Sequence, residues 1–403
     1  MPKKPAARPA QAKARSLAAL ALVALLGGAC PGRVGSAQES PDAAFAAGDF
    51  AAAGRGYRDL LAAHPSDQNA GIGLASVELF SNDLASARVR LESILSRDPT
   101  NERVLHLMHD LSLRTGTSGD FRVKINGSEA AVPFVTTDPL PVLVVRVNDK
   151  LNGLFFIDTG APDIVLDPDF ASELGIAATP GEVGVFAGGK RAAVDHAKID
   201  SIVLGNARVE NVPATVLTSR SFPQLGGRHL DGVIGTGLLD RFLSTIDYAH
   251  GRLELRLRNN SKAFEESAAR RGAAAIPIWL VGDHFIFARG HINDGPVGLF
   301  NVDTGLAGGG VSASQETLRE AHVFLDRAHE TQGMGGGGPV TIVPFDATVT
   351  LGTTTVAGVQ GLFTPEGTPY GMFPFHVSGT VSHGFFRRFT MTLDFDAMRL
   401  VLE

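Results

Sequence analysis

The residues Gly-Leu-Phe-Phe-Ile-Asp-Thr-Gly occupy positions 153–160, and Gly-Leu-Phe-Asn-Val-Asp-Thr-Gly occupy positions 298–305. In both stretches an apolar run typical of a buried β-strand ends at Asp-Thr-Gly. A single Asp-Thr-Gly indicates little, because Asp and Gly also favour ordinary turns. Here the whole context recurs, with Asp158 and Asp303 at equivalent ends. This favours a shared role for the two aspartates over two unrelated turns.

The repetition extends along most of the chain after residue 120. Matching pairs of stretches are 132–134 with 276–278, 202–205 with 349–352, 232–243 with 379–390, and 245–248 with 392–395. The offset is 145 residues at the aspartates and 147 in the later pairs. Short β-type runs separated by Gly and Pro fill both halves. The sequence therefore predicts two similar β lobes, residues 120–258 and 276–403, joined by the Ala-, Glu- and Arg-rich stretch 264–275.

These motifs resemble the signature of aspartic proteases, in which each lobe supplies an apolar strand ending in Asp-Thr/Ser-Gly. A later apolar-apolar-Gly element, here Val233-Ile-Gly235, braces that loop. The resemblance covers residues 120–403 and is closest to a retropepsin-like protease fused into one chain, with features of the pepsin-like enzymes. It implies a mainly β bilobal domain with a pseudo-twofold axis. It also implies Asp158 and Asp303 as catalytic residues, supported by Thr159, Gly160, Thr304 and Gly305.

The implied chemistry follows from two carboxyl groups in contact. They cannot both ionise easily, so they share one proton. The ionised group accepts a proton from the attacking water, and the protonated group polarises the scissile carbonyl. In the resemblance, Thr159 and Thr304 cross-link the two loops by hydrogen bonds, and Gly160 and Gly305 allow close backbone approach. The expected function is hydrolysis of peptide bonds in a peptide or protein substrate, with no cofactor and no metal.

Each lobe of such a protein carries a flap, a hairpin with glycines at its tip that closes over an extended peptide. The flap candidates are Gly188 and Gly189 in the first lobe, and Gly335 and Gly336 in the second. For the second stretch an exposed surface loop is an equally good interpretation.

The second lobe departs from the pattern at two positions. Leu306 follows its Asp-Thr-Gly where Ala161 follows the first, and Ser382 stands where Gly235 stands. Neither flap candidate contains the tyrosine that is typical of pepsin-like enzymes. These departures motivate an alternative function: a catalytically weak or inactive, protease-like protein that binds peptides or acts as a scaffold in the cell envelope.

The N-terminal residues have the pattern of an export signal. Basic residues up to Arg15 precede an uncharged apolar run, Leu17 to Ala29, which is too short to span a bilayer comfortably. We expect residues 1–37 to be a signal peptide and the protein to be periplasmic or associated with the cell envelope. Cys30 ends a stretch that resembles a lipoprotein box, although Gly27 replaces the usual leucine. A lipidated Cys30 and an ordinary signal cysteine stay open as alternatives; contact with the membrane is expected only through such an anchor.

Residues 41–118 show a helical repeat. Gly48-Asp-Phe matches Asn82-Asp-Leu, and Pro65 matches Pro99, each 34 residues later. This period resembles the tetratricopeptide repeat, in which each helix pair buries its apolar face against its neighbours. The resemblance implies a docking module for a protein partner, a holder for one dedicated substrate, or a spacer.

Composition excludes several classes of function. The 403 residues are 44% hydrophobic and carry a net charge of −6, which leaves no basic excess for binding nucleic acid. A single cysteine excludes an intrachain disulfide framework and a cysteine-based metal site. Five histidines of the β region lack metal-ligand spacing and are expected to be exposed or hydrogen-bonded: His229, His284, His291, His376 and His383. Three acidic residues after the first site are expected in a solvated loop: Asp163, Asp167 and Asp169.

Overall fold

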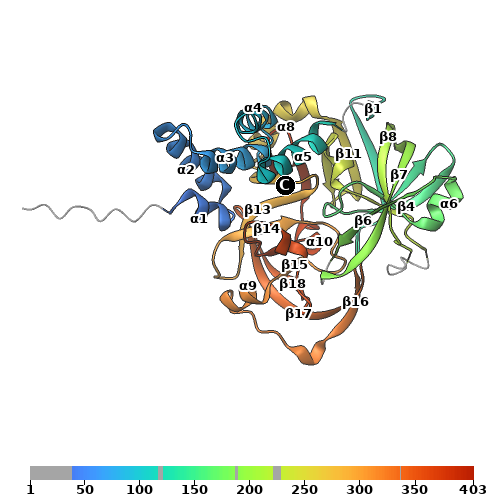
Figure 1. Ribbon diagram of the computed structural model, residues 1–403. Helices are drawn as coiled ribbons and strands as arrows, with labels where there is room; N and C mark the ends of the chain where they lie inside the picture. The colour runs from blue at the N-terminus through green and yellow to red at the C-terminus, as the bar shows by residue number, and fades with distance from the viewer. Residues whose placement is uncertain (1–38, 117–120, 187–188, 221–227, 336) are drawn as a thin grey trace, which may run out of the picture. The chain divides into compact units, whose positions relative to one another are not determined.

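The computed structural model describes residues 39–403, apart from 117–120, 187–188, 221–227 and 336 (Figure 1). The predicted signal segment 1–37, with Cys30, lies outside the described residues. In the part of the chain that the structure describes, no helix is both long and apolar enough to cross a membrane.

The region before the β lobes consists of helices connected by short turns. They are α1 (Pro41–Ala46), α2 (Phe50–Ala63), α3 (Gln68–Phe80), α4 (Leu84–Leu95) and α5 (Glu102–Gly116). Asp49 and Asp83 cap α2 and α4 by accepting hydrogen bonds from the backbone N–H of Ala52 and Ser86. An N-cap aspartate satisfies an otherwise unpaired N–H of the first turn. The two caps lie 34 residues apart, so the repeat in the sequence is a repeat of helix starts.

Lobe 1 is built from short strands with two small helices. Its elements are β1 (Arg122–Ile125), β2 (Glu129–Thr136), β3 (Val142–Val147), β4 (Leu151–Ile157), β5 (Ile164–Leu166), α6 (Pro168–Leu174), β6 (Thr179–Val185), β7 (Arg191–Leu204), β8 (Ala207–Val216), β9 (Gly232–Ile234) and α7 (Thr236–Leu239). Lobe 1 ends with β10 (Phe242–Asp247) and β11 (Arg252–Leu257), and the 3₁₀ turn η3 (Arg258–Asn260) and α8 (Ser261–Arg271) join it to lobe 2.

Lobe 2 repeats this order of elements. It contains β12 (Ala274–Val281), β13 (Phe285–Ile292), β14 (Gly298–Val302), β15 (Val311–Ala313), α9 (Gln315–Glu320), η4 (Arg327–His329), β16 (Thr331–Gly335), β17 (Gly338–Leu351), β18 (Thr354–Phe363), η5 (Pro369–Met372), β19 (Gly379–Val381), α10 (His383–Phe386), β20 (Thr390–Asp394) and β21 (Arg399–Leu402). The strand registers repeat as well: Phe155 pairs with Gly232 in parallel, and Phe300 pairs with Gly379 in the same way.

A sheet shared by both lobes carries the pseudo-twofold axis. Its strands run in the order β2, β11, β10, β20, β21, β12, all antiparallel. At its centre Thr245 faces Thr392, its own equivalent 147 residues later, and their hydroxyl oxygens lie 2.8 Å apart. The predicted fold class, a helical repeat region followed by two similar β lobes, is confirmed.

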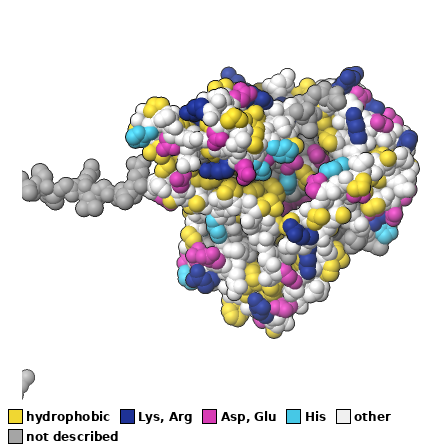
Figure 2. Space-filling view, viewed as in Figure 1, with side chains coloured by type: hydrophobic (Ala, Val, Ile, Leu, Met, Phe, Trp, Pro, Cys, Tyr) yellow, Lys and Arg dark blue, Asp and Glu magenta, His cyan; other side chains and the backbone are white. Residues whose placement is uncertain are grey.

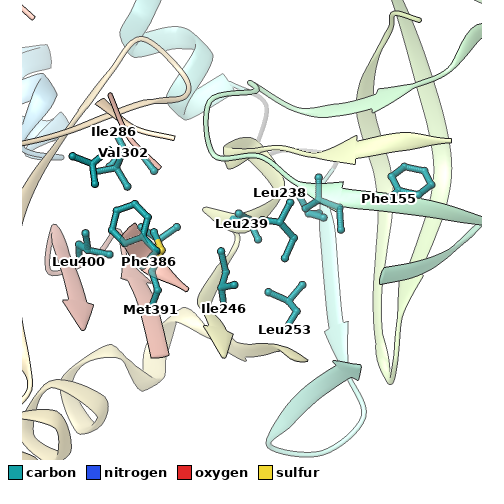
Figure 3. Packing of buried hydrophobic residues seen from close by; sticks show 14 of the residues in the cluster. Phe155, Leu238, Leu239, Ile246, Leu253, Ile286, Val302, Phe386, Met391 and Leu400 are labelled. Carbon is teal, nitrogen blue, oxygen red and sulfur yellow. The ribbon is translucent and has the colours of Figure 1, made fainter. Parts of the chain in front are cut away.

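One hydrophobic cluster runs through both lobes and the shared sheet. Figure 3 shows Phe155, Leu238 and Leu239 of lobe 1 on one side and Val302, Phe386 and Met391 of lobe 2 on the other. Ile246 and Leu253 of the shared sheet lie below Leu238 and Leu239 in this view and belong to the same cluster. Because burial of such side chains is the main favourable term in folding, the lobes are joined through their core as well as by the chain.

The helices are part of a second core, which they share with lobe 2. The Phe50 ring lies 5.6 Å from Trp279 and 5.0 Å from Phe375, centroid to centroid. Backbone groups join the same two regions, since His376 N–H donates to Ala46 at 2.7 Å. The Arg114 guanidinium donates to the carbonyls of Leu79 and Leu280, which lie on opposite sides of the contact. Burial lowers the pKa of Arg114 to about 10. The helices therefore cover a face of lobe 2.

Candidate active site

The two Asp-Thr-Gly loops start at the ends of equivalent strands. Asp158 follows β4 and Asp303 follows β14. In lobe 1, β9 lies between β4 and β5, parallel to the first and antiparallel to the second; β19 lies between β14 and β15 in the same way. The N–H of Asp158 donates to Ile234 at 3.0 Å, and that of Asp303 donates to Val381 at 3.1 Å. The bracing strands thus hold the first residue of each loop.

The threonines interlock the two loops. The N–H of Thr159 donates to Thr304 Oγ1 at 3.1 Å, and the N–H of Thr304 donates to Thr159 Oγ1 at 3.1 Å. Each hydroxyl in turn donates across the axis, Thr159 to the Val302 carbonyl at 2.8 Å and Thr304 to the Ile157 carbonyl at 3.0 Å. Both threonines are fully buried. These reciprocal bonds satisfy every buried polar atom of the two side chains and fix the loops relative to each other.

The glycines bring each loop against the aspartate of the other lobe. A Cβ at Gly160 would lie 2.5 Å from Asp303 Cγ, and one at Gly305 would lie 2.4 Å from Asp158 Cγ. Both distances are far below a van der Waals contact, so any side chain at either position would displace a carboxyl group. The N–H groups of Gly160 and Gly305 donate to the carboxylates of Asp158 and Asp303, each at 2.8 Å.

The closeness of the two carboxyl groups sets their electrostatics. The pKa of Asp158 is raised well above its usual value, first by burial, then by the negative charge of Asp303 and a hydrogen bond with it. A carboxyl group with a raised pKa keeps its proton to a higher pH than a free carboxyl group does. The pair is therefore arranged to hold one proton between two carboxylates.

The departures of lobe 2 from the pattern have a structural explanation. At Gly235 a Cβ would lie 2.3 Å from the Asp163 carbonyl oxygen and 2.6 Å from that of Ala161. The loop between Asp-Thr-Gly and the next strand has three residues in lobe 1 (161–163) and five in lobe 2 (306–310). Ser382, the counterpart of Gly235, is fully buried beside this longer loop. Its hydroxyl accepts the N–H of Leu306 at 3.1 Å. The serine side chain thus occupies space that the longer loop leaves and fastens Leu306 to the bracing strand.

The flap candidates fall between paired strands of each lobe. β6 pairs antiparallel with β7, and β16 pairs antiparallel with β17. Gly189 has a φ of 65°, and Gly335 ends β16; Gly188 and Gly336 lie outside the described residues. A Cβ at Gly337 would lie 2.5 Å from Lys190 Cβ, so the tips of the two lobes contact each other. Their role as flaps stays a prediction.

The expectation of a solvated acidic loop after the first site is wrong for Asp167. This residue is 2% exposed, and its carboxylate accepts the N–H groups of Asp169, Ser219 and Arg220. The Asp-Pro pair at 167–168 could have signalled this, because Asp before a proline is typical of a helix N-cap, here that of α6. Asp169 is exposed as expected. Asp163 is half-buried, and burial and the charge of Asp283 raise its pKa to about 6.

His383 also differs from expectation, because it is 1% exposed and neither ring nitrogen has a hydrogen-bond partner among the described residues. It lies where lobe 1 has Thr236, whose hydroxyl donates to the Thr159 carbonyl at 2.8 Å. Its Nε2 is 3.9 Å from the Asp138 carboxylate, and its ring packs against Tyr248. The pKa of His383 is lowered to about 4, mainly by burial. The charge of Asp138 raises this pKa, and the charge of Arg387 lowers it further.

This burial predicts a loss of stability in acid. Unfolded, His383 takes up a proton below about pH 6.5, whereas the folded protein does so only below about pH 4. Its contribution is therefore complete above pH 6.5 and falls by about 3 kcal/mol as the pH is lowered to 4. Between pH 7 and 4.5, the fall in the unfolding free energy should be smaller by about 2.5 kcal/mol in His383→Leu than in wild type, as measured by denaturant titration at the two pH values. The exposed control His376→Leu should leave the pH dependence unchanged; equal slopes in all three proteins would contradict the assignment.

No group of three or more His, Cys, Asp or Glu side chains that could hold a metal ion occurs among the described residues.

Prediction from the sequence missed the polar residues behind Asp303, namely Asn301, Thr380 and Tyr370. The available signal was a single asparagine in a strand whose lobe 1 counterpart is entirely apolar at the same positions.

Comparison with known families agrees with this geometry. Residues 143–238 match the model of an aspartyl protease family, and residues 44–111 match a tetratricopeptide repeat. A segment similar to aspartyl proteases thus follows a segment similar to tetratricopeptide repeats. The aspartyl-protease match includes Asp158, Thr159, Gly160 and the bracing residues up to Gly235.

Several solved structures are similar to the chain. A retropepsin-like aspartic protease from Rickettsia conorii is 22% identical over 34% of this chain and 95% of its own, with a TM-score of 0.26. An aspartic proteinase from Irpex lacteus is 13% identical over 68% and 97%, with a TM-score of 0.43. Conglutin gamma, a basic 7S globulin from lupine seeds, is 10% identical over 70% and 95%, with a TM-score of 0.42. No curated protein matches the chain significantly.

Proposed function

We propose that this protein is an exported aspartic endopeptidase in which Asp158 and Asp303 activate a water molecule for hydrolysis of a peptide bond. The observation that carries the proposal is the reciprocal interlock of the two Asp-Thr-Gly loops. It holds two carboxyl groups in contact across a pseudo-twofold axis and leaves them one proton to share. Residues 1–37 direct export, and Cys30 anchors the protein if it is acylated.

In the proposed mechanism the ionised carboxylate accepts a proton from a water between the two aspartates. The resulting nucleophile attacks the scissile carbonyl, while the protonated carboxyl group donates a hydrogen bond to the carbonyl oxygen. The tetrahedral intermediate collapses when the leaving nitrogen takes a proton from the dyad. The dyad returns to its singly protonated form, so no other proton donor is required. The N–H groups of Gly160 and Gly305 keep the carboxylates oriented throughout.

The hairpins β6–β7 and β16–β17 fit the role of flaps over an extended peptide. They come from opposite lobes, and their tips meet at Lys190 and Gly337. The substrate is a peptide or an unfolded protein segment, because such a segment passes between two hairpins more readily than a folded domain. Figure 2 shows Lys and Arg side chains interspersed with Asp and Glu on the visible face, which favours a protein substrate over a polyanion.

The alternative, a peptide-binding scaffold without activity, was motivated by Leu306 and Ser382. The hydrogen bond between these two residues maintains the second loop, which favours the enzyme over the scaffold.

A cleavage assay distinguishes the two functions directly. An unstructured protein is incubated with the full chain from pH 3 to 8, with and without a statine-type transition-state analogue. We expect inhibitor-sensitive fragments, with activity falling as the pH rises above the raised pKa of the dyad. Peptide binding without fragments at any pH would support the scaffold.

A further inference from the structure

The two sides of the site differ in chemistry at matching positions. In lobe 1, Phe156 on β4 pairs with Val233 on β9. In lobe 2 the equivalent pair is Asn301 on β14 and Thr380 on β19. Successive side chains of a strand point to opposite faces, so a residue two positions before another shares its face. Phe156 therefore shares a face with Asp158, and Asn301 with Asp303.

The lobe 1 face is apolar around these positions. Phe156 and Val233 are each 4% exposed and belong to a small hydrophobic cluster separate from the main core. Its buried members are Leu140, Val142, Phe156, Val165, Leu230 and Val233. A wall of this composition favours a large apolar side chain and offers none of its side chains as a hydrogen-bond partner.

The lobe 2 face carries a hydrogen-bonded trio instead. The Asn301 amide donates from Nδ2 to the Tyr370 hydroxyl at 3.2 Å, and that hydroxyl shares a hydrogen bond with Thr380 Oγ1. All three side chains are less than a tenth exposed. The pKa of Tyr370 is raised by burial and by the charge of Asp303, with a smaller contribution from Asp158. Tyr370 therefore lies close enough to both aspartates for their charges to act on its hydroxyl group.

The three side chains do not satisfy all of their own hydrogen-bonding groups. The Asn301 Oδ1 is buried and has no hydrogen-bond partner among the described residues. The bond between the Tyr370 and Thr380 hydroxyls uses one of their two protons, which leaves one donor unused. An acceptor and a donor are thus unpaired on the same wall, next to Asp303. Buried polar groups normally have partners, so this pair indicates a ligand that supplies both.

We propose that lobe 2 selects a substrate carboxamide side chain, Asn or Gln, beside the scissile bond, while lobe 1 takes a large apolar side chain on the other side. A carboxamide donates to Asn301 Oδ1 and accepts the free hydroxyl proton. A charged side chain is disfavoured, because the trio contains no counter-ion and burial of an unpaired charge is costly. This inference rests on the proposed function, since the scissile bond is the one cleaved by the dyad.

The competing explanation is that the trio only supports the Asp303 loop. The two explanations are distinguished by specificity, measured with the full chain on two peptides that differ only in Gln or Leu at the position facing lobe 2. That position is identified from cleavage of a randomised peptide library or, where wild type cleaves none of it, from the peptides of the library that Asp158→Asn retains. We expect wild type to prefer Gln by at least about tenfold in kcat/KM, because a site built for hydrogen bonds rejects an apolar analogue.

Asn301→Leu and Thr380→Val give lobe 2 the apolar character that lobe 1 has at the equivalent positions. Each should bring the ratio of kcat/KM for the Gln peptide to that for the Leu peptide to one or below. The matched lobe 1 variant Phe156→Leu should change the preference on the other side and leave this ratio intact. A wild-type ratio near one, or an equal loss on both peptides in Asn301→Leu, would overturn the proposal.

A binding measurement separates this proposal from the proposed function. The same two peptides are titrated into Asp158→Asn and followed by fluorescence anisotropy. Tighter binding of the Gln peptide supports the inference even if wild type cleaves neither peptide, in which case the endopeptidase function fails alone. Cleavage without a preference, in kinetics and in binding, overturns the inference and leaves the function standing.

Discussion

Asp158→Asn and Asp303→Asn should each reduce kcat by at least about 10²–10⁴-fold, the usual size of a general acid–base contribution. Asparagine keeps the shape of the side chain and can still accept the N–H of Gly160 or Gly305. It cannot take a proton from water, and it cannot hold the shared proton. Removing either carboxyl group therefore removes both halves of the proposed chemistry, since the dyad works as a unit.

The fold should survive this substitution. The raised pKa of Asp158 means that its ionised form is disfavoured in the folded protein, so the cost of ionising it grows as the pH rises through the folded pKa. Asparagine carries no such cost, and Asp158→Asn should raise the melting temperature at neutral pH. Circular dichroism would report the fold, and fragment analysis would report the activity. Asp169→Asn, which changes an exposed acid in the first turn of α6, is the control and should keep full activity. Activity above a tenth of wild type in either dyad variant would refute the assignment.

The site was predictable from the sequence to the extent that it depends on local pattern and duplication. An apolar run before Asp-Thr-Gly predicts where Asp158 and Asp303 lie, and the constant offset predicts that the two loops are equivalent. The structure places both loops together with the threonine and glycine contacts that the family resemblance implied. The pairing of Thr245 with Thr392 on the axis also follows from the duplication.

Features that arise from non-local packing could not be predicted in this way. From the sequence, Ser382 is only a departure from the bracing pattern. Its role is seen in the structure, because its hydroxyl accepts the N–H of Leu306, which lies 76 residues earlier in the longer loop of lobe 2. Burial of His383 depends on Tyr248 and Asp138, which lie far away in the sequence. The most consequential case is the helical region, whose aromatic residues pair with positions more than 200 residues later in a cluster that no periodicity reveals.

That cluster changes what removal of the helices should do. If the repeats were an adaptor for one dedicated substrate, disrupting them would impair that substrate and spare a short generic peptide. In the structure, Phe50 packs on Trp279 and Phe375. Phe375 lies just before β19, the strand whose Val381 carbonyl accepts the N–H of Asp303. The helices therefore support the segment that positions one of the two aspartates, and both substrates should be affected alike.

Phe50→Ala tests this with a single residue. Truncation of a fully buried phenylalanine costs about 3–5 kcal/mol, which is a large part of the stability of a typical domain. Urea unfolding of the full chain should show this loss, and kcat/KM should fall by the same factor for a short peptide and for an unstructured protein. Val89→Ala, on the exposed side of α4, is the control and should stay within about 0.5 kcal/mol of wild type. Loss confined to the protein substrate, with stability unchanged, would restore the adaptor interpretation. Parallel losses would mean that the repeats belong to the catalytic unit, and that any partner must bind a face of the helices that lobe 2 does not cover.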